Sequence, residues 1–164
     1  MATSPLNRVV REVTKNAALE DISNFLSSAI SFNQGDLCYY DTALNLVKPN
    51  TGGATQGAQA LGIAVVTVVN GVLASPFQGT AVDASEKTSA LPGPAFGVEA
   101  KLFLTAGDVM TPGIKVYYSA TDAQHVQITA NGTAIGHYVG ASLTAVAGQE
   151  GVIRLYNNWN ITEM

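Results

Sequence analysis

Short segments in which apolar and polar residues alternate make up most of the chain after residue 34, and they end at turns rich in glycine. The clearest alternation covers residues 95–105, where Val98, Ala100, Leu102 and Leu104 alternate with more polar positions. Successive side chains of a strand point to opposite faces, so this period of two predicts a half-buried strand. Further strands are predicted at residues 37–41, 61–70, 72–75, 77–84, 115–119, 134–140 and 152–156. Such a series predicts an all-β fold, either a small β-barrel or a β-sandwich.

One part of this pattern occurs twice. Residues 35–40 (GDLCYY) return as residues 113–118 (GIKVYY), and each copy is followed by an apolar segment with an internal glycine, at residues 61–66 and 135–140. We interpret the two stretches as a duplicated β unit of a turn, a tyrosine-rich strand, a loop and a second strand.

Glycine and proline mark the expected turns. The dipeptides Asn70-Gly71 and Asn131-Gly132 predict two β-hairpins. Residues 48–59 and 85–94 predict long loops. Glycines inside predicted strands indicate β-bulges or sharp barrel corners, and they stand at positions 62, 136 and 140.

The N-terminal region has a different pattern. Residues 1–16 are polar and predict an extended arm. Apolar residues at helical spacing then predict a short helix at residues 17–27, and the alternative is a strand at residues 29–33 that leads into the Gly35 turn. The expected organisation is an arm at 1–16, a single β-rich domain at 17–156 and a C-terminal tail at 157–164.

Charged residues form only 12% of the chain, whereas hydrophobic residues form 47%; the usual charged share is roughly 25%. No charged residue lies within residues 123–149, and Lys48 is the only one within residues 42–82. Large uncharged surfaces are often buried against other proteins, so these stretches predict a protein interface. The alternative is a neutral surface of threonine, asparagine and glutamine.

The net charge of −4 argues against a nucleic-acid partner, because nucleic-acid-binding proteins usually carry a basic face. The only basic group is Arg8, Arg11 and Lys15, with Glu12 among them. No apolar run is long enough to span a bilayer and the first residues lack the apolar centre of a signal peptide, so we expect no membrane partner and synthesis in the cytoplasm.

The sequence shows no set of residues for catalysis or metal binding. Its two histidines, His125 and His137, are interpreted as ordinary surface residues of strands and turns, and two scattered histidines with one cysteine make a poor set of zinc ligands. The single cysteine, Cys38, takes the place of Val116 in the repeat, which predicts a small apolar strand residue. Calcium-binding and phosphate-binding loops are also missing. We therefore expect no enzyme, no cofactor and no small-molecule substrate.

Each copy of the repeat carries a tyrosine pair. Adjacent strand residues point to opposite faces, so one tyrosine of each pair should enter the core and the other should face outward. Tyrosine is enriched at protein interfaces. The candidate subunit-interface residues are Tyr40, Tyr118, His137 and Tyr138.

The segments FLTAGD at residues 103–108, Gly113, VYY at 116–118 and Ile135-Gly136 together resemble the small β-rich capsid decoration (cement) proteins of tailed bacteriophages. Gly35-Asp36-Leu37 and residues 61–64 show the same pattern in the first half. The resemblance covers roughly residues 35–156. It implies a β-barrel or β-tulip body and a homotrimer on the outer surface of the virion, where it clamps neighbouring subunits of the major capsid protein.

The resemblance also implies that the N-terminal arm contacts the capsid. Its valines could add a strand to an exposed sheet edge, and its basic residues could steer it to an acidic surface. The candidate arm residues are Arg8, Val9, Val10, Arg11, Val13 and Lys15.

The expected function is therefore that of a structural virion protein that stabilises the capsid. The alternative is a carbohydrate-binding β module of a phage head or tail fibre, which would use the outward tyrosines and Trp159. An enzyme comes third and would need a pair of acids that we do not find.

Overall fold

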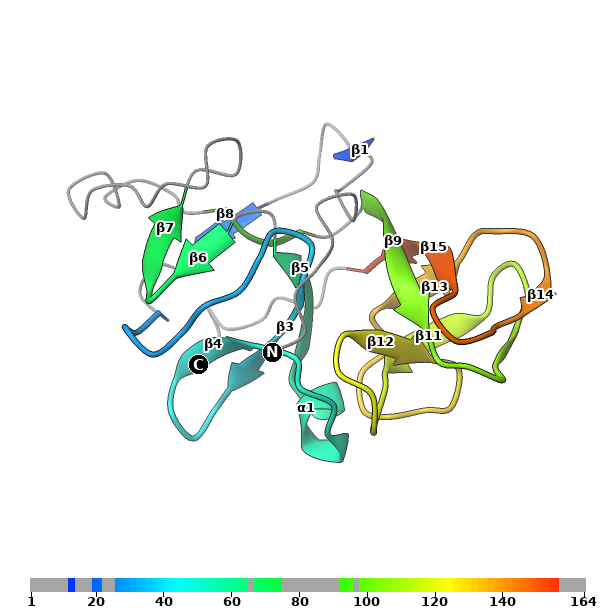
Figure 1. Cartoon of the computed structure of the whole chain (residues 1–164), viewed down its shortest axis with the longest axis horizontal. Coiled ribbons are helices and arrows are strands. Elements are labelled where there is room, and N and C mark those ends of the chain that lie inside the picture. The colour runs from blue at the N-terminus through cyan, green and yellow to red at the C-terminus, as the bar shows by residue number, and fades with distance from the viewer. Residues whose placement is uncertain are drawn as a thin grey trace.

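Five strands from the second half of the chain close a barrel in the computed structural model, which describes residues 12–13, 19–21, 26–64, 67–74, 92–95 and 98–156 (Figure 1). The order around the barrel is β9 (Val98–Leu104), β12 (His125–Gln127), β11 (Lys115–Tyr118), β13 (Gly136–Tyr138) and β15 (Glu150–Leu155), and β15 pairs again with β9. Only the β12–β9 pair is parallel. Closure removes the free edges that a short sheet would otherwise expose.

The alternation of β9 explains its place in the barrel. Ala100, Leu102 and Leu104 are buried, whereas Lys101 and Phe103 are partly exposed, as the sequence predicts. The two-residue strand β1 (Glu12–Val13) pairs with the first residues of β9.

The first half of the chain forms a five-stranded sheet. Its order is β2 (Leu19–Asp21), β8 (Pro92–Ala95), β5 (Ala60–Ala64), β3 (Leu37–Asp41) and β4 (Leu46–Pro49). Two ribbons complete the described strands: β6 (Thr67–Val69) with β7 (Val72–Ala74), and β10 (Val109–Met110) with β14 (Leu143–Thr144). The one described helix is α1 (Ala54–Ala58).

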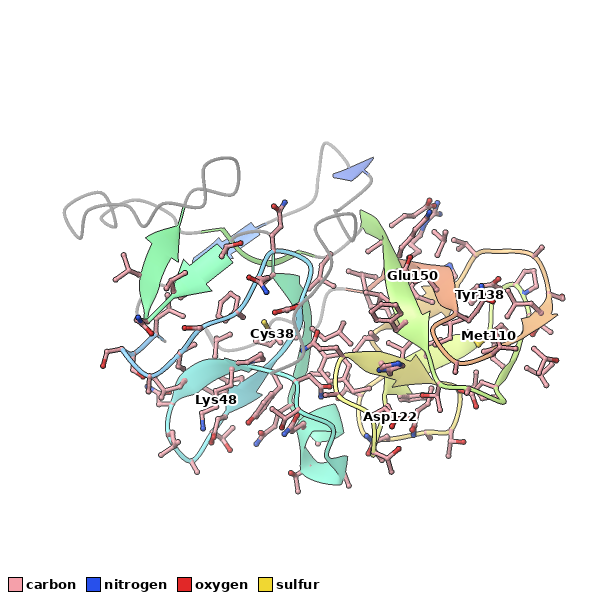
Figure 2. The ribbon with its side chains drawn as sticks, in the orientation of Figure 1. Cys38, Lys48, Met110, Asp122, Tyr138 and Glu150 are labelled. Atoms are coloured by element: carbon pink, nitrogen blue, oxygen red, sulfur yellow. The ribbon has the colours of Figure 1, made fainter. Side chains whose placement is uncertain are left out.

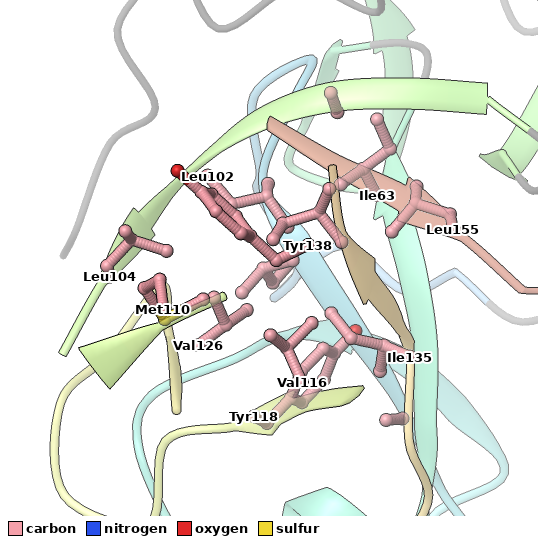
Figure 3. Close-up of a cluster of buried hydrophobic side chains, with 14 of the residues drawn as sticks. Ile63, Leu102, Leu104, Met110, Val116, Tyr118, Val126, Ile135, Tyr138 and Leu155 are labelled. Atoms are coloured by element: carbon pink, nitrogen blue, oxygen red, sulfur yellow. The ribbon is translucent and has the colours of Figure 1, made fainter. Parts of the chain in front are cut away.

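The five-stranded sheet lies between two hydrophobic cores. Leu37 and Ile63 belong to the core that fills the barrel (Figure 3), whereas Cys38 and Leu61 belong to a second core that includes Phe32. All five residues of β5 are buried. A strand that is covered on both faces reads as a continuous apolar run rather than an alternating one, and this explains the sequence ALGIA of β5.

Three turns start strands with the same geometry. Gly35, Gly107 and Gly113 each adopt a positive φ, of 90°, 93° and 87°. Each glycine N–H donates to a carbonyl of a paired strand or its extension, and the acceptors are, in order, Ala64, Ala145 and Tyr138. A left-handed φ favours glycine, which explains the repeated glycine two positions before each strand.

A β-bulge interrupts the pairing of β3 with β5. Cys38 pairs with Gly62, but the next residue, Tyr39, pairs with Ala60, so Leu61 is the extra residue. Gly62 takes a φ of 131°. The predicted irregularity at Gly62 is therefore confirmed.

The predicted helix at residues 17–27 is wrong where the structure describes it, because Leu19–Asp21 forms β2 and pairs with β8. Cross-strand pairing outweighs a weak local periodicity here. The alternative strand at 29–33 is present only as a single bridge from Phe32 to Val68.

The two Asn-Gly dipeptides have different outcomes. Asn70-Gly71 joins β6 to β7 with φ values of 50° and 75°, so this hairpin is confirmed. Asn131-Gly132 also turns the chain, but no hairpin forms: β12 and β13 both pair with β11, which lies between them.

Both predicted long loops contain some regular structure. Residues 48–59 include the end of β4 and helix α1, and residues 92–94 belong to β8 despite Pro92 and Pro94. The predicted strand at 77–84 and the C-terminal tail lie outside the described residues. Within the described part, no helix is long and apolar enough to cross a membrane.

Candidate functional site

The side chain of Tyr118 joins the barrel to the five-stranded sheet. Its hydroxyl accepts a hydrogen bond from the Gly62 N–H at 3.0 Å, and its own hydrogen faces the carbonyl oxygens of Cys38 and Gly62. These groups lie beside the β3–β5 bulge, where the register of the ladder shifts. Burial raises the pKa of Tyr118, so the hydroxyl remains a donor. The Tyr118 hydroxyl therefore provides hydrogen-bond partners for backbone groups of the five-stranded sheet that lie at the bulge.

Gln124 makes a second polar connection between the two halves. Its side chain accepts from the Leu37 N–H at 2.6 Å and donates to the carbonyls of Leu37 at 3.0 Å and Asn50 at 2.9 Å. Its backbone N–H donates to the Asn50 Oδ1 at 3.0 Å. Gln124 is buried and adopts a φ of 62°. The fold thus uses this glutamine as an internal connector, which no local sequence pattern indicates.

The candidate interface tyrosines lie mostly inside the molecule. Tyr40, Tyr118 and Tyr138 are buried, whereas Tyr39 and Tyr117 are partly exposed. The expectation of one inward and one outward tyrosine holds for Tyr118 and Tyr117, but Tyr39 also packs against the barrel core, and the interface candidates Tyr40 and Tyr118 both face inward. The reason is that Tyr40 faces the second core and Tyr118 the barrel core.

His137 is the partly exposed member of the candidate interface set. It lies near the Tyr156 hydroxyl, with 3.2 Å between Nδ1 and the oxygen. The other histidine, His125, stacks on Phe103 with ring centroids 5.4 Å apart. No group of three or more metal-binding side chains occurs within the described ranges. The subunit interface itself stays a prediction.

Of the candidate arm residues, the structure describes only Val13, which lies in β1 and pairs with Val98 of β9. Arg8, Val9, Val10, Arg11 and Lys15 lie outside the described residues. The proposed contact of this arm with a capsid also stays a prediction.

Cys38 is buried in the second core, as its place in the repeat predicts. Burial, and then the charge of Asp36, raises the pKa of its thiol. A protonated thiol without solvent access is a poor nucleophile, so Cys38 is an apolar core residue in the folded chain.

The β3–β4 hairpin presents an exposed leucine on a loop that is held by side chains. Asp41 Oδ1 accepts from the backbone N–H groups of Ala43 at 3.1 Å and Leu44 at 3.2 Å, while Asp41 Oδ2 accepts from Lys48 Nζ at 2.8 Å. Tyr40 donates to Asn45 on the other side of the loop. The side chain of Leu44 is 58% exposed. We call residues 42–45 the hairpin tip.

The Asp41–Lys48 pair predicts a stability that falls in acid. The hydrogen bond from Lys48, and then the backbone donors, hold the pKa of Asp41 below its ordinary value of 3.8. A depressed folded-state pKa contributes stability above the unfolded value, and this contribution is lost as the pH falls through the folded-state pKa. We expect the free energy of unfolding of the native protein to fall more steeply below about pH 4 than that of Asp41→Asn. Urea unfolding between pH 2 and 6 measures the pH dependence of the two proteins. In Lys48→Met, which lacks the cation, the loss of stability in acid should be smaller than in the native protein. Parallel pH curves for all three proteins would contradict a stabilising role of the Asp41–Lys48 pair.

The end of the barrel that bears β10 and β14 consists of two turns that together contain a single charged residue. We define residues 106–113 and 141–148 as the barrel end; Asp108 is its only charged residue, and its carboxylate accepts from the backbone N–H of Ile128 at 2.9 Å. Val109 and Val146 are 54% and 62% exposed. The exposed surface of residues 141–148 is therefore apolar or neutral, as the charge-free stretch at residues 123–149 predicts, and residues 106–113 add one charge, that of Asp108.

An open hollow of about 490 Å³ lies beside the barrel end. Glycines 140, 148 and 151, Val146 and Ala147 contribute to its lining, and Lys101 and Glu150 contribute charged groups. Tyr138 forms part of the wall, and its hydroxyl donates to the Ala141 carbonyl at 2.7 Å. Neither Lys101 nor Glu150 forms an ion pair within the described part of the chain.

Comparisons with known proteins give no assignment: no family model matches this chain, and no curated protein matches it.

Proposed function

We propose that this chain is a structural virion protein that binds the outer surface of a phage capsid as a homotrimer and stabilises neighbouring major capsid subunits. The observation that carries the proposal is the barrel end, where Asp108 is the only charged residue and Val109 and Val146 are exposed on turns of a closed barrel. Exposed apolar side chains on a surface with few charges are typical of protein-binding sites. The sequence resemblance supplies the capsid as the partner.

We also infer that the two halves contain copies of one β unit. In the first copy Cys38 pairs with Gly62, and in the second Val116 pairs with Gly136, so corresponding residues of the repeat have corresponding partners. The matching turns at Gly35 and Gly113 support the same interpretation. A duplicated unit suits a structural protein, because it supplies a stable scaffold without any requirement for a catalytic set.

The experiment uses capsid shells that lack the protein and measures binding of the added chain and the temperature of DNA release. Binding of many copies to the assembled shell alone should raise that temperature. We expect Val109→Asp to weaken shell binding about tenfold or more, because it places a charge on an apolar contact. Val69→Asp is the matched control, since Val69 is an exposed valine on the β6–β7 hairpin.

A second variant separates the arm from the barrel end. Deletion of residues 2–11 removes Arg8 and Arg11 but retains β1, so the folded body should keep its circular dichroism spectrum while shell binding weakens. Equal DNA release with and without the protein would contradict the capsid function. Unchanged shell binding by the deletion variant would show that the arm does not contribute to binding, and it would leave the proposal for the barrel end in place.

A further inference from the structure

The hairpin tip and the hollow lie on different halves of the molecule. The tip joins β3 to β4 in the five-stranded sheet, whereas the hollow lies beside β13 and β15 of the barrel. Figure 2 shows the same separation, with Lys48 at the left and Tyr138 and Glu150 at the right. One chain therefore presents the tip and the hollow in different places, where two neighbouring copies can each use one of them.

Leu44 and Val146 have the two most exposed large apolar side chains among the described residues, at 58% and 62%. A single exposed apolar residue is ordinary. The surroundings of these two are more specific, because Leu44 stands on a loop held by Asp41 and Tyr40, and Val146 lines a hollow with a glycine-rich lining. A hollow of about 490 Å³ has ample room for a leucine side chain.

The charges beside the two features are also complementary. The tip carries Asp41 and Lys48, which pair with each other at 2.8 Å, and both side chains keep partial exposure. The hollow carries Lys101 and Glu150, neither of which has an ion-pair partner in the described residues. Each surface thus offers one cation and one anion beside an apolar centre, as an apolar contact with a polar rim requires.

We propose that the hairpin tip of one copy docks into the hollow of a second copy, with Leu44 against Val146 and Ala147 and with the Asp41–Lys48 pair facing Lys101 and Glu150. This contact is heterologous, since it joins two different surfaces, and such contacts form closed rings or open chains. This contact adds to the proposed function the surface through which subunits of the homotrimer would meet. Only the number of subunits in the assembly rests on the proposed function. The contact takes Val146 from the barrel end, and it leaves Val109, which does not line the hollow, as the exposed valine for the capsid.

Cysteine cross-linking tests the pairing directly. Cys38 is buried, so new surface cysteines should be the reactive thiols of the folded protein. A Leu44→Cys chain mixed with an Ala147→Cys chain should give mixed dimers with a short bismaleimide. Replacing the second chain with Ala130→Cys, also an exposed alanine, provides the matched control. Mixed dimers no more abundant than in this control, or only dimers of identical chains, would overturn the proposal.

Sedimentation equilibrium tests the energetics of the same contact. We expect Leu44→Ser to raise the dissociation constant about tenfold, while Val69→Ser changes it by less than about twofold. The double variant Lys101→Glu with Glu150→Lys keeps the net charge but reverses the charges of the hollow, so it should weaken association most at low salt. No self-association of the native chain up to about 1 mM would overturn the proposal, and so would equal association by the native chain and the charge-reversed variant.

These measurements use the free protein, so they do not depend on capsid binding. Cross-links in a chain that fails to bind shells would reject the proposed function and retain the contact. Shell binding by a chain that shows no tip-to-hollow cross-link would retain the function and reject the contact.

Discussion

Replacement of Gln124 with alanine should lower the free energy of unfolding by about 3 kcal/mol, because buried polar groups that lose their partners cost roughly 1–3 kcal/mol each. The substitution leaves the Leu37 N–H and the Asn50 carbonyl without their bonds to this side chain. Both groups lie in the first half of the chain, so the loss weakens the connection between the sheet and the barrel. Equilibrium urea unfolding measures the effect.

Gln127 provides the control for this variant. Its side chain accepts from the Ala120 N–H at 3.0 Å and donates to the Thr129 carbonyl at 2.9 Å, so its bonds are local and partly exposed. We expect Gln127→Ala to cost about 1 kcal/mol or less. If the two alanine variants unfold at the same urea concentration, Gln124 does not connect the halves in the way described.

Replacement of Gly132 with alanine should also be strongly destabilising. A Cβ at this position would overlap the backbone of Gly57 and lie 2.6 Å from the Ala58 Cα, and Gly132 has a φ of 73°. A left-handed conformation costs an L-residue about 1–2 kcal/mol, and forced movement of packed groups costs about 1–3 kcal/mol more. We therefore expect a loss of about 3 kcal/mol in the free energy of unfolding.

Gly113→Ala separates the two causes. Gly113 has a φ of 87°, but a Cβ there would meet no atom within 4 Å. It should lose only the conformational part, about 1–2 kcal/mol. Equal losses for the two variants would show that Gly132 is required for its backbone conformation alone and that its close approach to α1 is unimportant for stability.

Four of the five barrel strands were among the predicted ranges because their signal is local, and the exception is β12. In β9 one face is buried and the other is partly exposed, so Ala100, Leu102 and Leu104 recur with the period of a strand. Asn70-Gly71 was equally informative, since the left-handed φ values of this turn restrict the residue types that can form it. The glycine before each repeated strand belongs to the same class of signal.

The faces of the tyrosine pairs required the tertiary structure. β3 has a core on each side, so Leu37 and Cys38 are both buried and the local pattern does not say which tyrosine is more exposed.

The same dependence on distant residues explains why the sequence did not indicate Gln124 as a connector between the two halves. Its partners Leu37 and Asn50 lie 87 and 74 residues away, and no motif of neighbouring residues encodes such a contact.

The hairpin tip and the hollow had only a partial sequence signal. The charge-free stretch predicts a neutral surface around Val146, but it does not place Lys101 and Glu150 beside it. β9 and β15 bring those two charges together through antiparallel pairing. Exposure of Leu44 likewise depends on the hairpin loop that Asp41 and Tyr40 hold in place.

The sequence alone determined the all-β class, the alternation of β9 and the positions of the glycine turns, because strand period and left-handed φ are properties of a few neighbouring residues. The tertiary structure decided that β15 pairs with β9 to close the barrel and that β11 lies between β12 and β13. It also decided that residues 19–21 form a strand and not part of the predicted helix. These outcomes depend on which distant strands pair. The free energy of that pairing comes from cross-strand packing and backbone hydrogen bonds between residues that are far apart in the chain.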